Sequence, residues 1–385
     1  MKFMGYRRKD GKVGIRNHVI VMAGTLCSDI AAKKVAEKVP EAVYLHNPKG
    51  CAQTPQDTAV SLQIMSGLVA NPNVYGAVII GLGCETLQEG RYREAIASKA
   101  DKPVRYIKMQ DYGLRESVRL GAQMAEELLA EAAKIQREEC DVSELIVSLE
   151  CGGSDPTSGF SANNVVGWVS DKIVELGGTT ILAETPEALG AEHILRERGR
   201  TPEVGQKIYD AVKNNEKFFA DLGINVRDSN PSPGNKASGI TTLEEKSLGC
   251  VHKAGHAPFE AVYEYGEMIE KKGLVFYDAT AFDVVSVAAK IAGGAQITIF
   301  TTGMGNPIGS AVGPVIKVTG NHKTATVMDD IIDFDTSASI TGEKTLEELG
   351  QEMFDLVIAV CEGKTVKAEE NGCLEMAINQ FYSYA

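Results

Sequence analysis

Four cysteines stand where an apolar segment of this chain ends. Cys27 follows VIVMAGTL, Cys51 follows AVYLHNPKG, Cys84 follows VIIGLG and Cys151 follows LIVSLE. Open α/β sheets bind ligands outside the carboxyl ends of their strands, so thiols repeated there can converge on one point. The sequence therefore predicts a metal site that uses these four cysteines. The alternative is that each is a small buried hydrophobe at a strand end.

Three thiolates from separate strands suit two kinds of iron site. One is a [4Fe-4S] cluster with one open iron, and the other is a mononuclear Fe or Zn ion with an open position. Gly50 and Gly83 immediately precede two of the thiols, which suits a backbone that turns sharply to aim a ligand. Glu85 follows Cys84, and His46 lies near Cys51.

A second candidate site begins at Cys151, in the stretch ECGGSDPTSG. Backbone N–H groups in such a glycine-rich loop before a helix can hold an anion. The alternative is a tight strand-to-helix turn capped by Ser or Asp. The predicted substrate-binding residues of this loop are Gly152, Gly153, Ser154 and Asp155.

Two more turn-rich segments carry candidate substrate contacts. In PSPGNK the prolines and glycine stiffen the approach to Asn235 and Lys236, and residues 303–314 are rich in Gly and Pro after an apolar strand. Loops of this kind on a rigid scaffold usually carry function. We therefore add Asn235, Lys236, Thr302 and Gly303 to the predicted substrate-binding residues.

The elements that must position these residues alternate along the chain. The apolar runs predict strands at 18–26, 42–45, 75–82 and 103–108, and helical periodicity predicts helices at 28–39, 54–70, 89–99 and 114–138. Strand–helix alternation predicts parallel βαβ units. The expected fold is α/β, with two Rossmann-like parallel-sheet domains over residues 1–140 and 141–385 and ligand loops at the strand carboxyl ends. The polar stretch REECDVSE marks the boundary.

Composition excludes several classes of protein. The 385 residues are 44% hydrophobic and 24% charged with a net charge of -13, and no basic stripe with interleaved aromatics supports nucleic-acid binding. The longest apolar runs are about ten residues, far short of the ~20 that cross a membrane. The first residues contain no apolar core of a signal peptide. We expect a cytoplasmic protein whose eight cysteines need not pair.

Several long stretches, in this order along the chain, resemble the large-subunit portion of the altronate and galactarate dehydratase family. The matching stretches are GYRRKDGKVGIRNHV (5–19), TLCS (25–28), GLGCE (81–85), ECGGSDPTSGFSANNVVG (150–167), ETPEALGAEHIL (184–195), NPSPGNKASGITTLEEKSLG (230–249) and the segment 292–309. The resemblance implies a sugar-acid hydro-lyase that needs ferrous iron and makes a 2-keto-3-deoxy acid. It supports Cys27, Cys51 and Cys84 as one iron-binding set.

The resemblance also implies partners and alternatives. Fused members carry an N-terminal SAF domain before the GYRR segment, so we expect a separate small SAF-domain subunit and a homo- or hetero-oligomer. The family contains a sulfolactate sulfo-lyase large subunit, which is the alternative function. An alternative of another class is a non-catalytic metal-binding subunit. Cys250 does not match a general family cysteine.

The roles in the reaction are assigned as follows. Arg16 is predicted to bind the substrate carboxylate, since a guanidinium can do so bidentately. The catalytic base stays open between Lys236, His18 and Glu85, with His46 as a further candidate.

Overall fold

The computed structural model describes residues 1–381, and three sheets organise them. The first is a four-stranded parallel sheet in the order β4-β3-β5-β6. Its strands are β3 (His18–Ala23), β4 (Val43–Leu45), β5 (Val74–Gly81) and β6 (Val104–Lys108). They coincide with the four predicted strands. The central β3 and β5 are apolar runs buried between helices, whereas the edge strands β4 and β6 are largely half-buried.

Helices cover both faces of the four-stranded sheet. They are α1 (Asp29–Lys38), α2 (Pro55–Ala70), α3 (Glu89–Ala97) and α4 (Met109–Ala132). Alternate residues of β3 divide between two cores, because Val19 and Val21 pack with α1 and α4 while Ile20 and Met22 pack with α2. The predicted helix at 114–138 is too long at its end, since α4 stops at Ala132.

The second sheet has seven parallel strands in the order β10-β11-β9-β8-β12-β13-β14. The strands are β8 (Ile146–Cys151), β9 (Thr179–Leu182), β10 (Phe259–Tyr263), β11 (Gly273–Tyr277), β12 (Ile297–Thr301), β13 (Val315–Thr319) and β14 (Phe334–Asp335). The strands that follow β8 in the chain, β9 to β11, lie on one side of β8 in the sheet, and β12 to β14 lie on its other side. The strand order therefore reverses between β8 and β12, which is where such sheets bind ligands.

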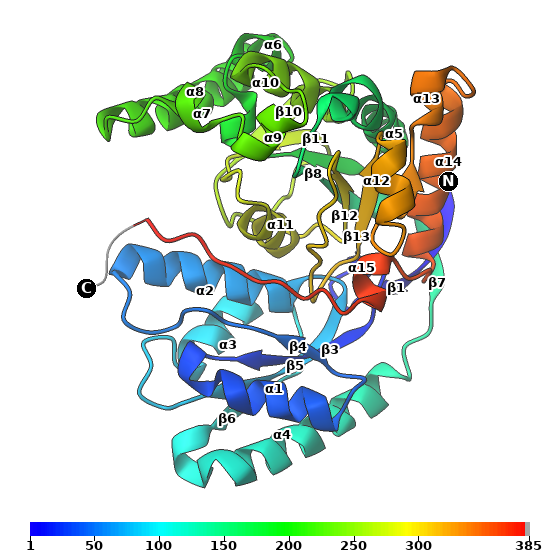
Figure 1. The fold of residues 1–385 in the computed structure, drawn as a ribbon. Helices are drawn as coiled ribbons and strands as arrows, with labels where there is room; N and C mark the ends of the chain where they lie inside the picture. The colour runs from blue at the N-terminus through cyan, green and yellow to red at the C-terminus, as the bar shows by residue number, and fades with distance from the viewer. Residues whose placement is uncertain (382–385) are drawn as a thin grey trace.

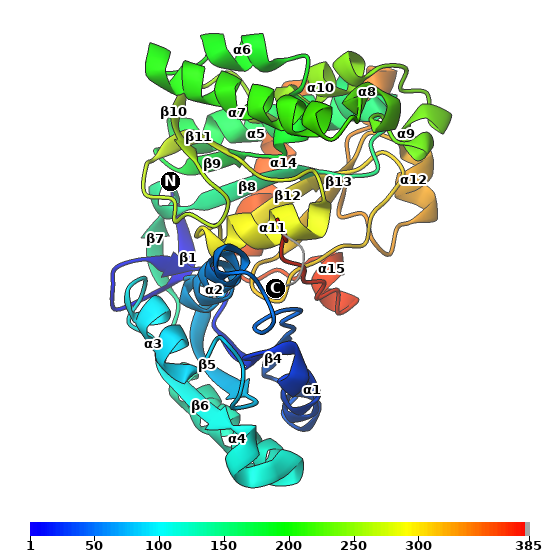
Figure 2. The ribbon, with the colours of Figure 1, turned by 90° about the vertical axis from the view of Figure 1, so that its left-hand side faces the viewer.

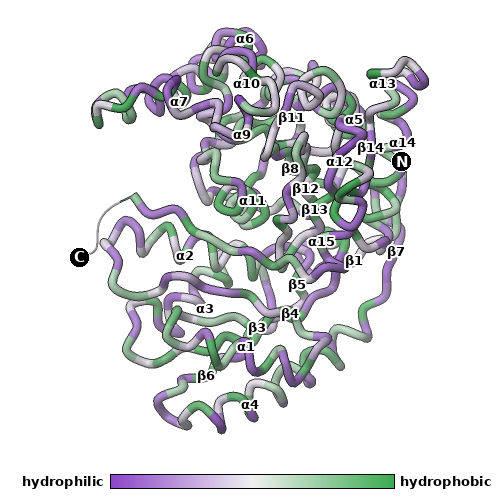
Figure 3. The backbone as a smooth tube through the Cα atoms, viewed as in Figure 1, coloured by the Kyte–Doolittle hydropathy of each residue, from purple (hydrophilic) through white to green (hydrophobic). Residues whose placement is uncertain are grey.

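The seven-stranded sheet lies between layers of helices. The long ones are α5 (Asn163–Glu175), α7 (Pro202–Asp221), α10 (Leu243–Val251), α11 (Asp283–Ala292) and α14 (Leu346–Cys361). The short ones are α6 (Glu192–Glu197), α8 (Val226–Ser229), α9 (Pro233–Ala237), α12 (His322–Val327), α13 (Ala338–Thr341) and α15 (Lys367–Glu370). Helices α6, α7 and α10 form the outer layer at the top of Figure 1, and α7 is largely hydrophilic in Figure 3.

A small antiparallel sheet was not predicted. Strand β1 (Lys2–Arg7) lies between β2 (Val13–Gly14) and β7 (Glu138–Asp141). The polar stretch expected to be a boundary is thus partly a strand, and Phe3 and Val13 pack in the core beneath the seven-stranded sheet. The division at residue 140 stays a prediction, and residues 382–385 of its second domain lie outside the described residues.

The two parallel sheets share a hydrophobic core where α2 packs against α11 (Figures 1 and 2). The contact is close because Gly67 of α2 faces the backbone of Ala292, where an added Cβ would lie 2.5 Å from the carbonyl oxygen. No helix of residues 1–381 has the length and apolarity needed to cross a membrane. The α/β fold with two parallel sheets is confirmed.

Candidate active site

The loops that carry Cys27, Cys51 and Cys84 meet at the carboxyl edge of the four-stranded sheet. Leu26 N–H donates to the Lys49 carbonyl at 2.9 Å, and Leu87 N–H donates to the Gly50 carbonyl at 3.1 Å. All three thiols are exposed. Within residues 1–381, however, their sulfur atoms do not form one group within 4.8 Å of one another. A single tetrahedral ion would need sulfurs about 3.8 Å apart, so the three thiols are not arranged around one such ion.

The backbone around these thiols turns sharply, as their glycines predicted. Gly50 and Gly83 have φ angles of 102° and 126°, and Ala52, directly after Cys51, has φ 55°. A Cβ at Gly50 would lie 2.7 Å from the Gly24 carbonyl oxygen, so only glycine fits there. Left-handed alanine is a strained conformation of the kind found at functional sites.

Two side chains near the thiols have well-defined partners. Asp29 Oδ1 lies 2.9 Å from His46 Nδ1, and the Tyr44 hydroxyl donates to Asp29 Oδ2 at 2.6 Å, so the carboxylate orients the half-buried imidazole. Glu85 is buried and accepts hydrogen bonds from the Gly83 N–H and the Tyr106 hydroxyl. These contacts hold the Cys84 loop, and the catalytic role of Glu85 stays a prediction.

His18 lies at the wrong end of its strand for the role predicted. It begins β3, whereas the thiol loops follow the carboxyl ends of β3, β4 and β5. Burial, with Arg16 nearby, lowers the pKa of His18 to about 4. The prediction of His18 as catalytic base is therefore wrong, because the length of the strand separates it from the site.

Arg16 is also wrongly predicted, because its guanidinium is already fully engaged. Its five N–H donors meet two oxygens of Glu369 and three backbone carbonyls, those of Ile15, Val360 and Lys364. The side chain ties the segment before β3 to the end of α14 and to α15. No donor is left for a substrate carboxylate.

Replacing Arg16 with lysine should lower the free energy of unfolding by about 2 kcal/mol, because a point charge cannot reproduce the planar fork. Urea unfolding measures the loss, and KM should stay unchanged. The control is Arg93→Lys, at an exposed pair with Glu89. A raised KM at unchanged stability would return Arg16 to the substrate.

The seven-stranded sheet brings together most of the predicted substrate-binding residues. Gly303 N–H and Met304 N–H donate to the Gly153 carbonyl at 3.0 and 2.8 Å. Asn235 Nδ2 donates to the Ser154 carbonyl at 2.7 Å. Gly152, Gly153, Ser154, Asp155, Asn235, Thr302 and Gly303 thus lie around the carboxyl ends of β8 and β12, at the reversal of strand order. Lys236 is on the neighbouring α9 with an exposed side chain.

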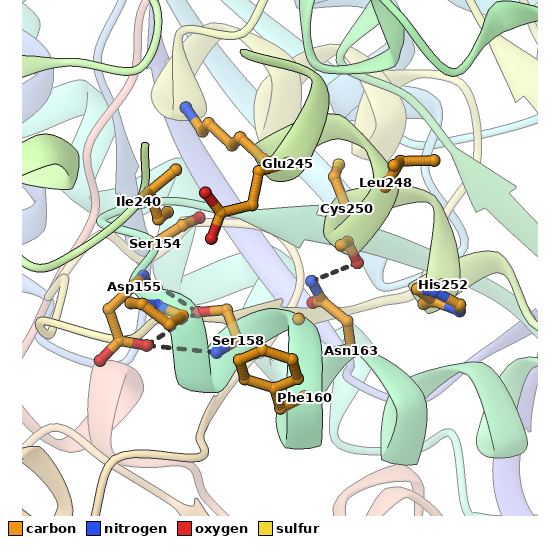
Figure 4. A pocket seen from close by; sticks show the side chains of 14 residues that line it. Ser154, Asp155, Ser158, Phe160, Asn163, Ile240, Glu245, Leu248, Cys250 and His252 are labelled. Carbon is orange, nitrogen blue, oxygen red and sulfur yellow. Dashed lines mark hydrogen bonds between the residues drawn. The ribbon is translucent and has the colours of Figure 1, made fainter. Parts of the chain in front are cut away.

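A cavity of about 260 Å³ opens beside this loop (Figure 4). The loop after β8 and the start of α5 form one wall, and α10 forms the other, joined by a 2.9 Å hydrogen bond from Asn163 Nδ2 to the Gly249 carbonyl. Lys246, Cys250 and His252 line the α10 side. Burial disfavours the charge on Lys246, but Glu187 at 2.8 Å raises its pKa above the ordinary value.

Cys151 lies apart from the other three predicted metal ligands. It is buried at the end of β8, where its Sγ is 3.7 Å from Cys250 Sγ and 3.6 Å from Glu184 Oε1. It belongs to a different sheet from Cys27, Cys51 and Cys84 and is grouped with Glu184 and Cys250, so its predicted place among the other three ligands stays a prediction. Sequence reasoning missed Glu184, although it follows the apolar strand TTILA, and set Cys250 aside.

Buried ion pairs surround Cys151. Lys253 pairs with Glu184 at 2.5 Å and Lys290 pairs with Glu150, and all four side chains are almost completely buried. Glu184 has a φ of 66°, so the only two non-glycine residues in the described chain with positive φ lie at the two candidate sites. Strained backbone of this kind is often functional.

Lys317 of β13 is a buried lysine close to the glycine-rich loops. Its ammonium donates to the Ile308 carbonyl and lies 3.8 Å from the centre of the Phe300 ring. Burial lowers the pKa of Lys317 to about 7 although Asp283, Asp333, Cys373 and Glu150 face it and raise it. The unfolded chain therefore binds one more proton than the folded chain between about pH 7 and pH 10.

The free energy of unfolding of the wild-type protein should therefore rise with pH between about pH 7 and pH 10. Compared with that of Lys317→Met, it should gain up to about 1.4 kcal/mol per pH unit. Urea unfolding at pH 7.5, 8.5 and 9.5 measures both proteins, and contributions from other groups cancel in the difference. Parallel curves would contradict the lowered pKa.

Comparisons with known proteins cover nearly the whole chain. Residues 5–133 match the family model described as D-galactarate dehydratase/Altronate hydrolase, second domain, and residues 142–384 match D-galactarate/Altronate dehydratase, C-terminal. An altronate dehydratase of Bacillus subtilis is 35% identical over 98% of this chain and 77% of its own length. The (2R)-sulfolactate sulfo-lyase subunit beta of Chromohalobacter salexigens is 34% identical over 100% of the chain and 98% of its length. A galactarate dehydratase (L-threo-forming) of Escherichia coli is 33% identical, over 94% and 73% respectively.

Proposed function

Because the chain belongs to the D-galactarate/altronate dehydratase family, we propose that it is a sugar-acid hydro-lyase that converts a 2,3-dihydroxy acid to a 2-keto-3-deoxy acid. The observation that carries the proposal is the match of both family models, which together span residues 5–133 and 142–384. The reaction removes a proton from C2 and expels hydroxide from C3. The resulting enol becomes a ketone when C3 takes a proton from water.

The cavity beside the glycine-rich loop is the proposed substrate site. Its volume of about 260 Å³ is just below the ~300–1,000 Å³ of pockets that bind drug-sized ligands. A cavity of this size suits a smaller ligand, such as a sugar acid of about six carbons. Lys246, rather than Arg16, is proposed to bind the carboxylate, because it lines the cavity from α10 and its ammonium uses only two of its three N–H donors, on Glu187 and Asn230. The proposed base is one of the titratable side chains that line the cavity, which are Asp155, Glu245, Lys246 and His252.

Lys246→Met should raise KM about 10- to 100-fold through loss of a charge-assisted hydrogen bond to the carboxylate. Initial rates over substrate concentration measure it. Lys217→Met, at an exposed pair with Asp221 on α7, is the control. Equal KM values for the two variants would remove Lys246 from the substrate.

The reaction is proposed to need iron, as Fe²⁺ or a [4Fe-4S] cluster, held by Cys27, Cys51 and Cys84. The exposure of the three thiols and the hydrogen bonds that join their loops support this iron site. Iron with an open position supplies Lewis-acid stabilisation of developing negative charge on oxygen. Asp29 and His46 lie beside these loops and fix the local hydrogen bonding.

The alternative function, release of sulfite from (2R)-sulfolactate, has a specific observation in its favour. The chain covers 98% of the length of the sulfo-lyase subunit beta. Because that relative is named as one subunit of an enzyme, it also supports our proposal that this chain works in an oligomer with a further, small SAF-type subunit. The test is a panel of hexonates, aldarates and (2R)-sulfolactate, assayed with and without such a subunit. Semicarbazide detects the 2-keto acid, and sulfite release is measured in parallel. Sulfite without any 2-keto-3-deoxy sugar acid would overturn the dehydratase assignment.

A further inference from the structure

Cys151, Cys250 and Glu184 form a buried three-ligand group beside the cavity, which Cys250 lines. Cys151 ends β8, Cys250 lies in the last turn of α10, and Glu184 follows β9. Their ligand atoms all lie within 4.8 Å of one another. The sulfur–sulfur distance of 3.7 Å is far longer than the ~2.05 Å of a disulfide, so both thiols are free.

The distances match the edges of a tetrahedron around one metal ion. With metal–sulfur bonds of about 2.3 Å and a metal–oxygen bond of about 2.1 Å, two sulfurs lie ~3.8 Å apart and a sulfur and an oxygen lie ~3.6 Å apart. The structure has 3.7 Å between the sulfurs and 3.6 Å from Cys151 Sγ to Glu184 Oε1. We propose that Cys151, Cys250 and Glu184 bind one divalent transition-metal ion of the Zn²⁺ or Fe²⁺ type, with a fourth position open.

The surroundings of Glu184 support this assignment. Its Oε2 accepts from Lys253 Nζ at 2.5 Å and from the Cys151 N–H at 3.0 Å, which leaves Oε1 directed at the thiols. Partners that hold the second oxygen of a ligand in this way orient it for a metal. Helix α10 and the turn after it deliver both Cys250 and Lys253, three residues apart.

Charge also balances at this site. Each thiol releases one proton to solvent as its metal–sulfur bond forms, so two thiolates offset the two charges of the ion. Glu184 is already offset by Lys253, and Glu150 by Lys290. Asp283 also lies beside Glu150 and Glu184, where Asn306 donates to it and Lys317 faces it. Pairing of the other charges lowers the cost of holding an ion in a low-dielectric interior.

The site is distinct from the iron proposed for Cys27, Cys51 and Cys84, and it does not depend on the reaction. A full-length chain with Cys27→Ala, Cys51→Ala and Cys84→Ala, reduced and stripped of metal, is therefore the background for Co²⁺ titration. It should bind one equivalent and show the visible bands of tetrahedral Co²⁺ with a sulfur-to-cobalt charge-transfer band. Adding Cys250→Ala should weaken binding at least ~100-fold and abolish the charge-transfer pattern of two thiolates.

The matched control adds Cys361→Ala, another fully buried thiol, which should leave the Co²⁺ spectrum unchanged. Circular dichroism checks folding. If Cys250→Ala fails to fold, anomalous scattering at the cobalt edge from crystals of the background protein must place the ion between Cys151, Cys250 and Glu184. A background protein that binds no Co²⁺, or a spectrum indifferent to Cys250, overturns the proposal.

Discussion

Replacing Lys290 with methionine is expected to lower the free energy of unfolding by about 3–5 kcal/mol, because it leaves the Glu150 carboxylate buried without its cation. Both side chains are fully buried, and Lys290 Nζ also donates to the Leu149 carbonyl at 2.6 Å. Ser286, which donates to Glu150 Oε2 at 2.8 Å, cannot neutralise the charge. Urea denaturation monitored by circular dichroism measures the loss.

The double variant Lys290→Met with Glu150→Gln provides the control. Removing both charges should recover most of the lost stability, since a neutral buried pair avoids the desolvation of an unpaired ion. If the double variant is as unstable as the sum of the singles, the ion pair is not the reason for the loss, and the packing of methionine is.

Replacing Cys84 with alanine should remove bound iron and reduce dehydratase activity at least ~100-fold. Loss of a group that only hydrogen-bonds a metal ligand typically lowers metal affinity or activity 10–100-fold, and loss of the ligand itself should cost more. The fold should survive, since Cys84 is exposed and leaves no cavity. Iron content and absorbance near 400 nm of anaerobically purified protein are measured together with activity.

Cys373→Ala, a half-buried thiol of the C-terminal segment, is the matched control and should keep both iron and activity. Retention of iron and activity in Cys84→Ala would contradict the cluster proposal. Iron retained with activity lost would instead give Cys84 a role in the reaction without a role in holding the metal.

The sequence allowed the parallel sheets to be predicted because their signals are local. Strands such as 74–81 are continuous apolar runs between periodic helices, and each matches its predicted position closely. The sheet formed by β1 and β7 was not predicted, because it pairs residues more than 130 positions apart and both strands contain polar as well as apolar side chains. Long-range antiparallel pairing leaves no local pattern.

The candidate sites, too, could be predicted only where the signal in the sequence is local. Glycines that precede Cys51 and Cys84 revealed the turns, since positive φ is a local requirement. Arg16 looked like a substrate ligand because its partners come from residues 360–369 at the far end of the chain. Cys250 was set aside because it does not match a general family cysteine, and only the tertiary packing of α10 brings it to Cys151.

The loop 303–314 and the C-terminal segment add a connection that the motifs did not suggest. Gly309 N–H donates to Glu375 at 2.9 Å, and farther along the same segment Gln380 accepts from Lys49, beside the Cys51 loop. Figure 1 shows this segment crossing from α15 over α2. It therefore touches the loops of both candidate sites.

The central claim is that this chain dehydrates a sugar acid, and proton NMR of the reaction in D₂O tests it most directly. A hexonate or aldarate incubated with the iron-loaded protein and the proposed small subunit should yield a 2-keto-3-deoxy acid with one deuterium at C3, where the enol is protonated by solvent. Absence of such a product from every sugar acid, with sulfite formed from (2R)-sulfolactate instead, would contradict the account.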